Sequence, residues 1–322
     1  MSKFNYRAVP KITICVPLFE RDKGRGNKKI QFLELLYIFL GLGILFFSSC
    51  DKITGPYVEE QNQNAVDTVK CPVPDFTPYS SPIRKILLED FTGHKCVNCP
   101  AAHDIATDLK NTYGDQLVIL AIHAGFFAKT DNDKYTYDFN TDAGAELNTY
   151  FQTNDVFPTG MINRIETNSS YLITKDNWAA TVDTLVNKTP TAYIQMVNDF
   201  DTTERRLCTH VNTEFLSSLN GTYHLCVFII EDSIVATQEN YVNSVATDVE
   251  DYVHYHVLRD AINGTWGDTV ATGAITTGYA KTLSYTYTVN DAWEAQHCSI
   301  IAFVYNDATK EILQVEQEKI IE

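Results

Sequence analysis

The chain has 322 residues, of which 44% are hydrophobic and 20% are charged. This balance excludes a disordered chain and suits one large or two ordinary folded domains. Residues 51–322 carry 17 basic and 38 acidic side chains, a net charge of −21. A field of this sign repels nucleic acids and anionic lipid surfaces, so we expect no nucleic-acid partner.

Residues 1–50 have the pattern of a targeting segment. A basic stretch at Arg21–Lys29 precedes an apolar run at Leu35–Phe47, and the segment ends with Ser-Ser-Cys at Cys50. The run is short for a membrane span and typical of a signal-peptide core. The end of the segment resembles a bacterial lipobox, which implies a signal peptide over residues 1–50 and a lipid on Cys50. An ordinary signal peptide or a membrane anchor is the alternative.

Residues 51–83 are polar and rich in proline, which predicts a flexible tether. An apolar run at Arg84–Gly93 then predicts a buried strand. The helix that follows has Pro100 in its first turn and Gly114 at its end. A second buried strand at Gln116–Gly125 completes a βαβ unit with parallel strands.

The next segments continue this first domain to residue 190. We expect a short helix over Asp142–Gln152, a strand over Phe157–Ile165 and an amphipathic helix over Thr174–Lys188. After Pro190 the chain consists of short strand-like runs, which predicts an antiparallel β-sandwich over residues 191–322.

Cys96 and Cys99 form a C-x-x-C pair at the expected start of a helix. Unpaired amides and a partial positive charge at a helix N-terminus stabilise a thiolate, so the first cysteine can act as a nucleophile. The second cysteine can then resolve a mixed disulfide. Lys95 should also favour the thiolate.

The segment Glu89–Pro100 resembles the active-site segment of the thioredoxin superfamily, and the resemblance covers roughly residues 84–190. It implies that Asp90 is the buried acid that assists proton transfer to Cys99. It also implies that Pro158, in Phe157-Pro158-Thr159, is the cis-proline that faces the cysteine pair and orients the substrate. The pair between the cysteines is Val97-Asn98, which differs from the thioredoxin pattern and leaves the reduction potential open.

Two other interpretations of the cysteine pair stay open. His94 and His103 flank it and could complete a zinc site, although structural zinc usually takes two separated pairs of ligands. Alternatively, Cys96 and Cys99 form a purely structural disulfide. Haem attachment is excluded, because it needs a histidine where Pro100 stands.

The remaining candidates have simpler interpretations. His254 and His256 would share one face of a strand. We interpret them as solvated side chains, with a metal site as the alternative. Cys226 and Cys298 are either buried free thiols or a disulfide between strands, and Cys208 has no obvious partner. We expect no bound metal and no cofactor.

The lipobox, the tether, the Asp90–Pro100 segment and a β-rich second half with His256–Asp268 together resemble the twenty-eight-kilodalton outer membrane protein family of Bacteroides-type lipoproteins. The resemblance implies a lipid-anchored protein of the outer membrane. The sequence therefore predicts an α/β thioredoxin-like domain, residues 84–190, followed by a β-sandwich. Its expected function is thiol–disulfide exchange on exported proteins. The alternative is a non-enzymatic surface or periplasmic binding lipoprotein whose C-x-x-C is a structural disulfide.

Overall fold

Two parallel strands joined by a helix open the folded part of the chain. In the computed structural model, which describes residues 66, 68–79 and 81–321, these elements are β1 (Ile86–Thr92), α2 (Cys99–Tyr113) and β2 (Leu117–His123). Every residue of β1 and β2 is buried, as expected for parallel strands covered on both faces. The helix ends at Gly114, whose positive φ of 56° favours glycine. The predicted βαβ unit is confirmed.

The following elements complete one end of the main sheet. They are α3 (Asp142–Tyr150), β3 (Thr159–Ile162) and α4 (Trp178–Leu185). β3 pairs antiparallel with β1, and Gly160 bridges onward to Ile173. A Cβ on Gly160 would lie 2.8 Å from Trp178, so glycine lets α4 pack closely against the strand.

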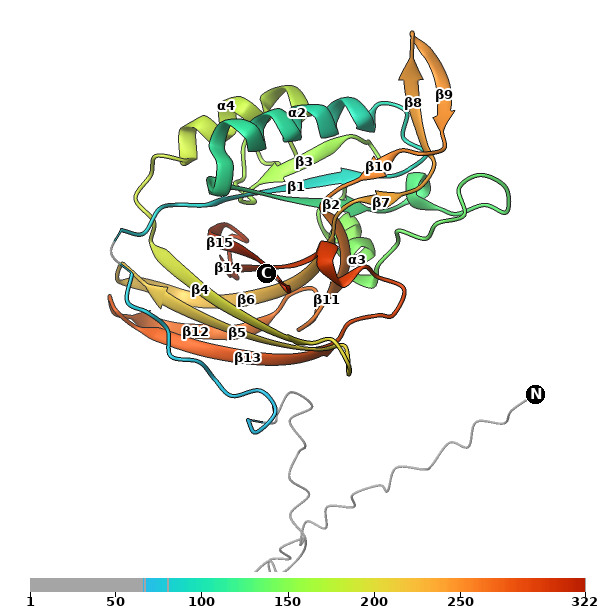
Figure 1. Cartoon of the computed structure of the whole chain (residues 1–322). Helices are drawn as coiled ribbons and strands as arrows, with labels where there is room; N and C mark the ends of the chain where they lie inside the picture. The colour runs from blue at the N-terminus through green and yellow to red at the C-terminus, as the bar shows by residue number, and fades with distance from the viewer. Residues whose placement is uncertain (1–65, 67, 80, 322) are drawn as a thin grey trace, which may run out of the picture. The chain divides into compact units, whose positions relative to one another are not determined.

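Helices cover both faces of this end of the sheet (Figure 1). On one face, Ile86, Leu88 and Ile119 form a hydrophobic cluster with α2 and α4. On the other face, α3 contributes Leu147 to a second cluster that extends into the C-terminal half of the chain. These clusters hold the start of α2 at a fixed position beside the end of β1.

The second half of the chain is built of strands, as its short strand-like runs predicted. A three-stranded sheet has the order β13-β5-β4, and it packs against the strands β6, β12 and β14 through a large apolar cluster. The bounds are β4 (Ala192–Asp201), β5 (Arg206–Phe215), β6 (Leu219–Glu231), β11 (Val257–Ala261), β12 (Asp268–Ile275), β13 (Ala280–Thr288), β14 (Cys298–Asn306) and β15 (Ile312–Lys319).

One large sheet includes strands from both predicted domains. Within the described residues its order is β15-β14-β6-β11-β2-β1-β3, with β12 paired to β6. The junction is the parallel pairing of Val257 with Ala121, and Ala121 N donates to His256 O at 2.8 Å. The sheet therefore continues across residue 190, where the sequence placed a domain boundary. Whether the two parts fold separately stays a prediction.

Two small β-ribbons between β6 and β11 were not predicted. β7 (Ile234–Val235) pairs with β10 (Val253–His254), and β8 (Gln238–Val242) pairs with β9 (Val245–Val249). Figure 1 shows the β8–β9 hairpin projecting at the edge of the molecule where α2 begins. In the described part of the chain, no helix has the length and apolar character needed to cross a bilayer.

Candidate functional site

The C-x-x-C pair lies at the start of α2, as the sequence predicted. Cys96 and Cys99 form a disulfide with their Cα atoms 5.4 Å apart. Cys99 is the first residue of the helix, and its backbone N donates to Cys96 O at 3.0 Å. Cys96 N donates in turn to Gly93 O at 2.9 Å. Two successive tight turns thus carry the chain from β1 into the helix and bring the two sulfur atoms together.

A segment from the second half of the chain lies against this loop. The side chain of Gln238, which is fully buried, donates to Cys96 O at 3.1 Å. The backbone N of Glu239 donates to His94 O at 2.8 Å. Cys96 is only 2% exposed, so the expected nucleophile is covered. The sequence offered no motif that marked Gln238 as part of the site.

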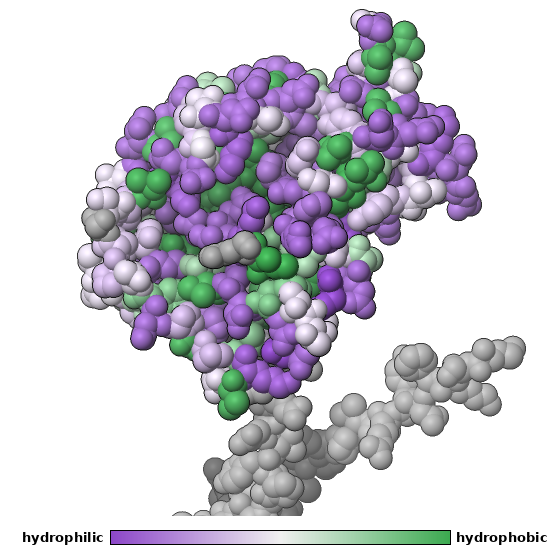
Figure 2. All heavy atoms as spheres, viewed as in Figure 1, coloured by the Kyte–Doolittle hydropathy of each residue, from purple (hydrophilic) through white to green (hydrophobic). Residues whose placement is uncertain are grey.

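The hairpin that starts at Gln238 ends in an exposed apolar tip. Figure 2 shows apolar atoms on the projecting hairpin, and three of its side chains are largely exposed: Tyr241, Val242 and Val245. The base of the hairpin is therefore bound to the cysteine loop, whereas its tip faces solvent.

Asp90 is buried below the cysteine loop, at the position that the sequence predicted. It lies on β1 between Ala121 and Gly160 of the neighbouring strands and is 1% exposed. Its Oδ1 atom has no hydrogen-bond partner, and its Oδ2 atom lies 3.7 Å from Nε2 of His103. Burial raises the pKa of Asp90 to about 8, because removal from water disfavours the charged carboxylate. Asp90 is therefore a neutral acid near pH 7.

Pro158 lies at the same end of the sheet. The Phe157–Pro158 peptide bond is cis, and Thr159 pairs with Phe91. This register places Pro158 beside the end of β1, where the cysteine loop begins. Three of the predicted site features, the cysteine pair, Asp90 and Pro158, thus meet at one edge of the molecule. Cys50 lies outside the described residues.

Lys95 does not stand free beside the cysteine pair. Its Nζ atom lies 3.1 Å from Oδ2 of Asp131 and 5.1 Å from the centre of the Tyr135 ring. The ammonium group is therefore partnered by a carboxylate of the loop after β2. Its expected effect on a Cys96 thiolate is reduced accordingly.

Buried histidines surround Phe139 next to the site. The rings of His94, His123 and His254 lie 5.6, 4.3 and 4.6 Å from the ring of Phe139, and each of these histidines is at most 2% exposed. Burial lowers the pKa of all three, that of His254 to about 3. The interpretation of His254 as a solvated side chain was wrong, because its strand β10 lies inside the segment that covers the cysteine loop.

The zinc interpretation finds no support in this geometry. The cysteines are joined to each other, and Nε2 of His94 lies 3.1 Å from Lys129 O. His103 is directed toward Asp90 and Thr92. Among the residues that the structure describes, no three histidine, cysteine or carboxylate side chains converge as metal ligands.

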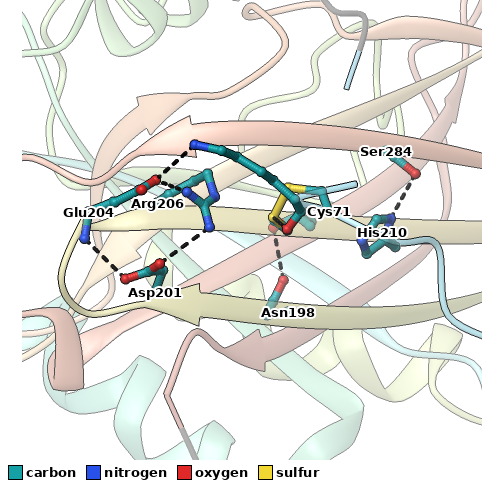
Figure 3. The surroundings of a disulfide bond; sticks show 10 residues. Cys71, Asn198, Asp201, Glu204, Arg206, His210 and Ser284 are labelled. Atoms are coloured by element: carbon teal, nitrogen blue, oxygen red, sulfur yellow. Dashed lines mark hydrogen bonds and ion pairs between the residues drawn. A yellow bond between two sulfur atoms is a disulfide. The ribbon is translucent and has the colours of Figure 1, made fainter. Parts of the chain in front are cut away.

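A second disulfide joins Cys71 to Cys208 across 137 residues (Figure 3). It fixes Cys71, which lies within the predicted tether, to strand β5. The side-chain amide of Gln195, on strand β4 of the same sheet, donates to Thr77 O. Residues 71–79 are thus attached to the sheet, which differs from the flexible tether predicted for residues 51–83. Residues 51–65 lie outside the described part. Cys226 and Cys298 are buried free thiols, one of the two alternatives that the sequence left open.

These features define a mixed α/β protein, mostly of strands, with a disulfide at the start of a helix and a buried acid beneath it. The sequence profile of the family described as outer membrane protein Omp28 matches residues 144–322. This match covers more than half of the chain, and the chain belongs to the Omp28 family. Its location is the outer membrane, as predicted. No curated protein sequence matches the chain.

Solved structures with a similar fold include HBP35 of Porphyromonas gingivalis. The matched region covers 75% of this chain and 77% of the HBP35 chain, with a TM-score of 0.55 and 16% sequence identity. This level of identity shows likeness of fold alone. A domain of the outer membrane lipoprotein Omp28 from the same organism is 24% identical over 41% of this chain and 90% of that domain, with a TM-score of 0.29.

Proposed function

We propose that this outer membrane protein exchanges disulfides with thiols of exported proteins through a thioredoxin-like site at Cys96 and Cys99. The arrangement of elements supports the proposal. A parallel β1-α2-β2 unit carries the cysteines, and β3 pairs antiparallel with β1 directly after a cis-proline. We assign a thioredoxin-like fold to residues 84–190 on the same grounds, and a β-sandwich to residues 191–322 because the sheet β13-β5-β4 packs against β6, β12 and β14.

The proposed reaction begins when a thiolate of an exported protein attacks Sγ of Cys96. The Cys96–Cys99 bond breaks, and Sγ of Cys99 leaves with the electron pair and takes the proton of Asp90. A second thiolate of the exported protein then attacks its own sulfur in the mixed disulfide, and Cys96 leaves as a thiolate. The exported protein is oxidised by two electrons and the cysteine pair is reduced. The reverse sequence would reduce an exported disulfide, and Pro158 would orient the substrate backbone in both directions.

The observation that carries the proposal is the buried acid. Oδ1 of Asp90 has no hydrogen-bond partner, and an unpaired buried polar group costs about 1–3 kcal/mol of stability. A disulfide that only holds the loop together needs no acid beneath it. A neutral carboxyl group with a pKa of about 8 is suited to give and take a proton near neutral pH.

The covered position of Cys96 adds a requirement to the proposal. A substrate sulfur must approach Cys96 along the axis of the disulfide. Gln238 and Glu239 are hydrogen-bonded to the loop on which Cys96 lies. The base of the β8–β9 hairpin must therefore move away before exchange. A partner that binds the apolar hairpin tip could cause this movement.

Trapping of mixed disulfides tests the exchange directly. In Cys99→Ala the nucleophile remains but the resolving thiol is lost, so complexes with exported proteins should accumulate on non-reducing gels. Cys96→Ala should trap none, and Cys226→Ala, which removes a buried free thiol, should behave like the wild type. If Cys99→Ala captures nothing, even when Gln238→Ala loosens the cover, the exchange function is wrong.

A lipid anchor at Cys50 is part of the same proposal. The apolar run that ends in Ser-Ser-Cys supports it, and a similar solved domain belongs to a protein described as an outer membrane lipoprotein. Labelled fatty acid should be incorporated into the wild type and not into Cys50→Ala. An unlabelled mature protein would remove the anchor from the proposal and leave the exchange chemistry untouched.

The second candidate function is a binding lipoprotein in which Cys96–Cys99 only holds the loop. The 2% exposure of Cys96 favours it. The reduction potential separates the two candidates. Structural disulfides in exported proteins usually lie below about −300 mV, whereas exchanging pairs lie nearer to the potential of their surroundings.

A further inference from the structure

Asp90 has no direct contact with bulk solvent for the proton that it handles. Its side chain is 1% exposed and lies under the cysteine loop. An acid that gives its proton to Cys99 must regain one before the next exchange. Neighbouring groups or buried waters must therefore carry protons between Asp90 and bulk solvent.

His103 is placed between Asp90 and the surface. It lies on α2, four residues after Cys99, and its side chain is 20% exposed. Its Nε2 atom lies 3.7 Å from Oδ2 of Asp90 and 3.0 Å from Oγ1 of Thr92. Its Nδ1 atom lies 2.9 Å from the hydroxyl oxygen of Tyr252. One ring nitrogen thus faces the acid, and the other faces a hydroxyl group on the segment that covers the site.

A small cavity connects these groups. It has a volume of about 40 Å³ and is lined by side chains that include Asp90, His103, Tyr252, Val253, Tyr255 and His256. A buried water needs roughly 10–15 Å³ of such volume, so the cavity has room for about three waters. Tyr255 is 53% exposed, so the far side of the cavity reaches the surface. The unpartnered carboxyl group of Asp90 forms part of its inner wall.

We propose that His103 exchanges the proton of Asp90 with solvent through this cavity, so that His103 and Tyr252 form the proton route of the redox site. A neutral imidazole has one N–H donor and one acceptor nitrogen. It can receive a proton at one nitrogen and release another at the opposite nitrogen. This inference rests on the proposed exchange function and adds residues to it. His103 touches neither sulfur nor substrate in this account.

The surroundings of His103 keep its ring neutral over the working range, mainly because the ring is removed from water. The titratable groups that face it are Asp90, His123, Tyr252, His254 and His256. His256 is itself paired with Asp232, with Nδ1 and Oδ1 3.3 Å apart, and its pKa is lowered mainly by burial, with a smaller contribution from Lys110. Burial, with a smaller contribution from His256, lowers the pKa of His103 to about 4. The charge of His103 therefore does not change between pH 6 and pH 9.

The test measures the rate at which the Cys96–Cys99 disulfide is reduced at two pH values. The mature chain is mixed with dithiothreitol, quenched with acid, and its free cysteines are counted by alkylation and mass spectrometry. At pH 6 Asp90 already holds a proton, so dithiothreitol should reduce the disulfide of His103→Gln at the wild-type rate. At pH 9 most Asp90 is ionised and the proton must enter from solvent, so the same variant should be about tenfold slower.

Controls separate proton transfer from structural damage. His224→Gln removes a histidine with the same 20% side-chain exposure on β6, and it should leave both rates unchanged. His103→Ala should regain its rate at pH 9 when imidazole is added, and Tyr252→Phe should slow the reaction at pH 9 only. Equal slowing of His103→Gln at both pH values, or none at either, would overturn the proton route.

The outcome for the proposed function is distinguishable. If Cys99→Ala and Cys99→Ala/Gln238→Ala trap no partner, the exchange function fails whatever His103 does. If they do trap partners and His103→Gln keeps the wild-type pH profile, only the proton route fails.

Discussion

The two disulfides of this protein lie in contrasting surroundings. Around Cys71–Cys208 several polar side chains are partnered: Thr209 donates to Asn198 at 2.9 Å, and His210 lies 2.8 Å from Ser284, whereas Nε of Arg206 has no hydrogen-bond partner (Figure 3). Around Cys96–Cys99 lie Asp90 with an unpartnered oxygen and His123 with two unpartnered ring nitrogens. Unsatisfied buried groups reduce stability. Those beside Cys96–Cys99 belong to an acid and a histidine, which can exchange protons, whereas the one on Arg206 beside Cys71–Cys208 belongs to a side chain that stays charged.

The largest expected effect comes from removing the Cys71–Cys208 disulfide. Cys71–Cys208 spans 137 residues and Cys96–Cys99 spans three. On the chain-entropy account, loss of the long link costs about 5 kcal/mol of unfolding free energy and loss of the short link about 2 kcal/mol. Urea unfolding of Cys71→Ala/Cys208→Ala and of Cys96→Ala/Cys99→Ala measures both. Equal losses would mean that the short link is also a main fastening.

A second effect concerns Asp90 alone. Its folded pKa of about 8 lies above its ordinary value of 3.8, so the folded state binds more protons and stability falls as pH rises from about 4 to 8. Asp90→Asn should remove this slope. At pH 7 the unfolding free energy of this variant should exceed that of the wild type by on the order of 4 kcal/mol. At pH 3.5 the two unfolding free energies should be equal. Urea unfolding against pH gives the curve, and an unchanged slope would contradict the buried-acid assignment.

The histidines around Phe139 should make this region sensitive to acid. The pKa of His254 falls to about 3 on burial, so its contribution is fully present above pH 6.5 and is lost as pH falls toward the folded value. His254→Phe should keep wild-type stability at pH 8. At pH 5 it should be more stable than the wild type by about 2 kcal/mol. Thermal unfolding at both pH values checks this, and a difference of the same size at pH 8 would point to packing instead.

The smallest effect sharpens the role of the cover. Gln238→Ala removes a hydrogen bond to Cys96 O, worth about 1–1.5 kcal/mol. Alkylation of reduced Cys96 should therefore be about tenfold faster in this variant. Gln195→Ala, which removes a hydrogen bond to Thr77 O near the other disulfide, should leave that rate unchanged. No acceleration in Gln238→Ala would show that another element limits access.

Local sequence determined the elements that carry the cysteine pair. Seven consecutive apolar-rich residues at Ile86–Thr92, Pro100 in a first helical turn and Gly114 after the last turn each restrict only their neighbours in the chain. For this reason the βαβ unit, the position of Cys96 and Cys99 and the amphipathic helix within Thr174–Lys188 could be predicted. The broad class of the second half followed from short strand-like runs in the same way.

Tertiary structure alone decided what surrounds the pair. Gln238 reaches Cys96 across 142 residues, His254 is buried because β10 lies beside the cysteine loop, and Cys71 meets Cys208 because the chain before β1 crosses strand β5. None of these contacts has a local pattern, since each depends on how the strands of both halves are ordered in space. The sequence placed a sulfur pair at the start of a helix. The packing of residues 232–256 against it decided that the pair is covered, and that its acid and its histidines are buried.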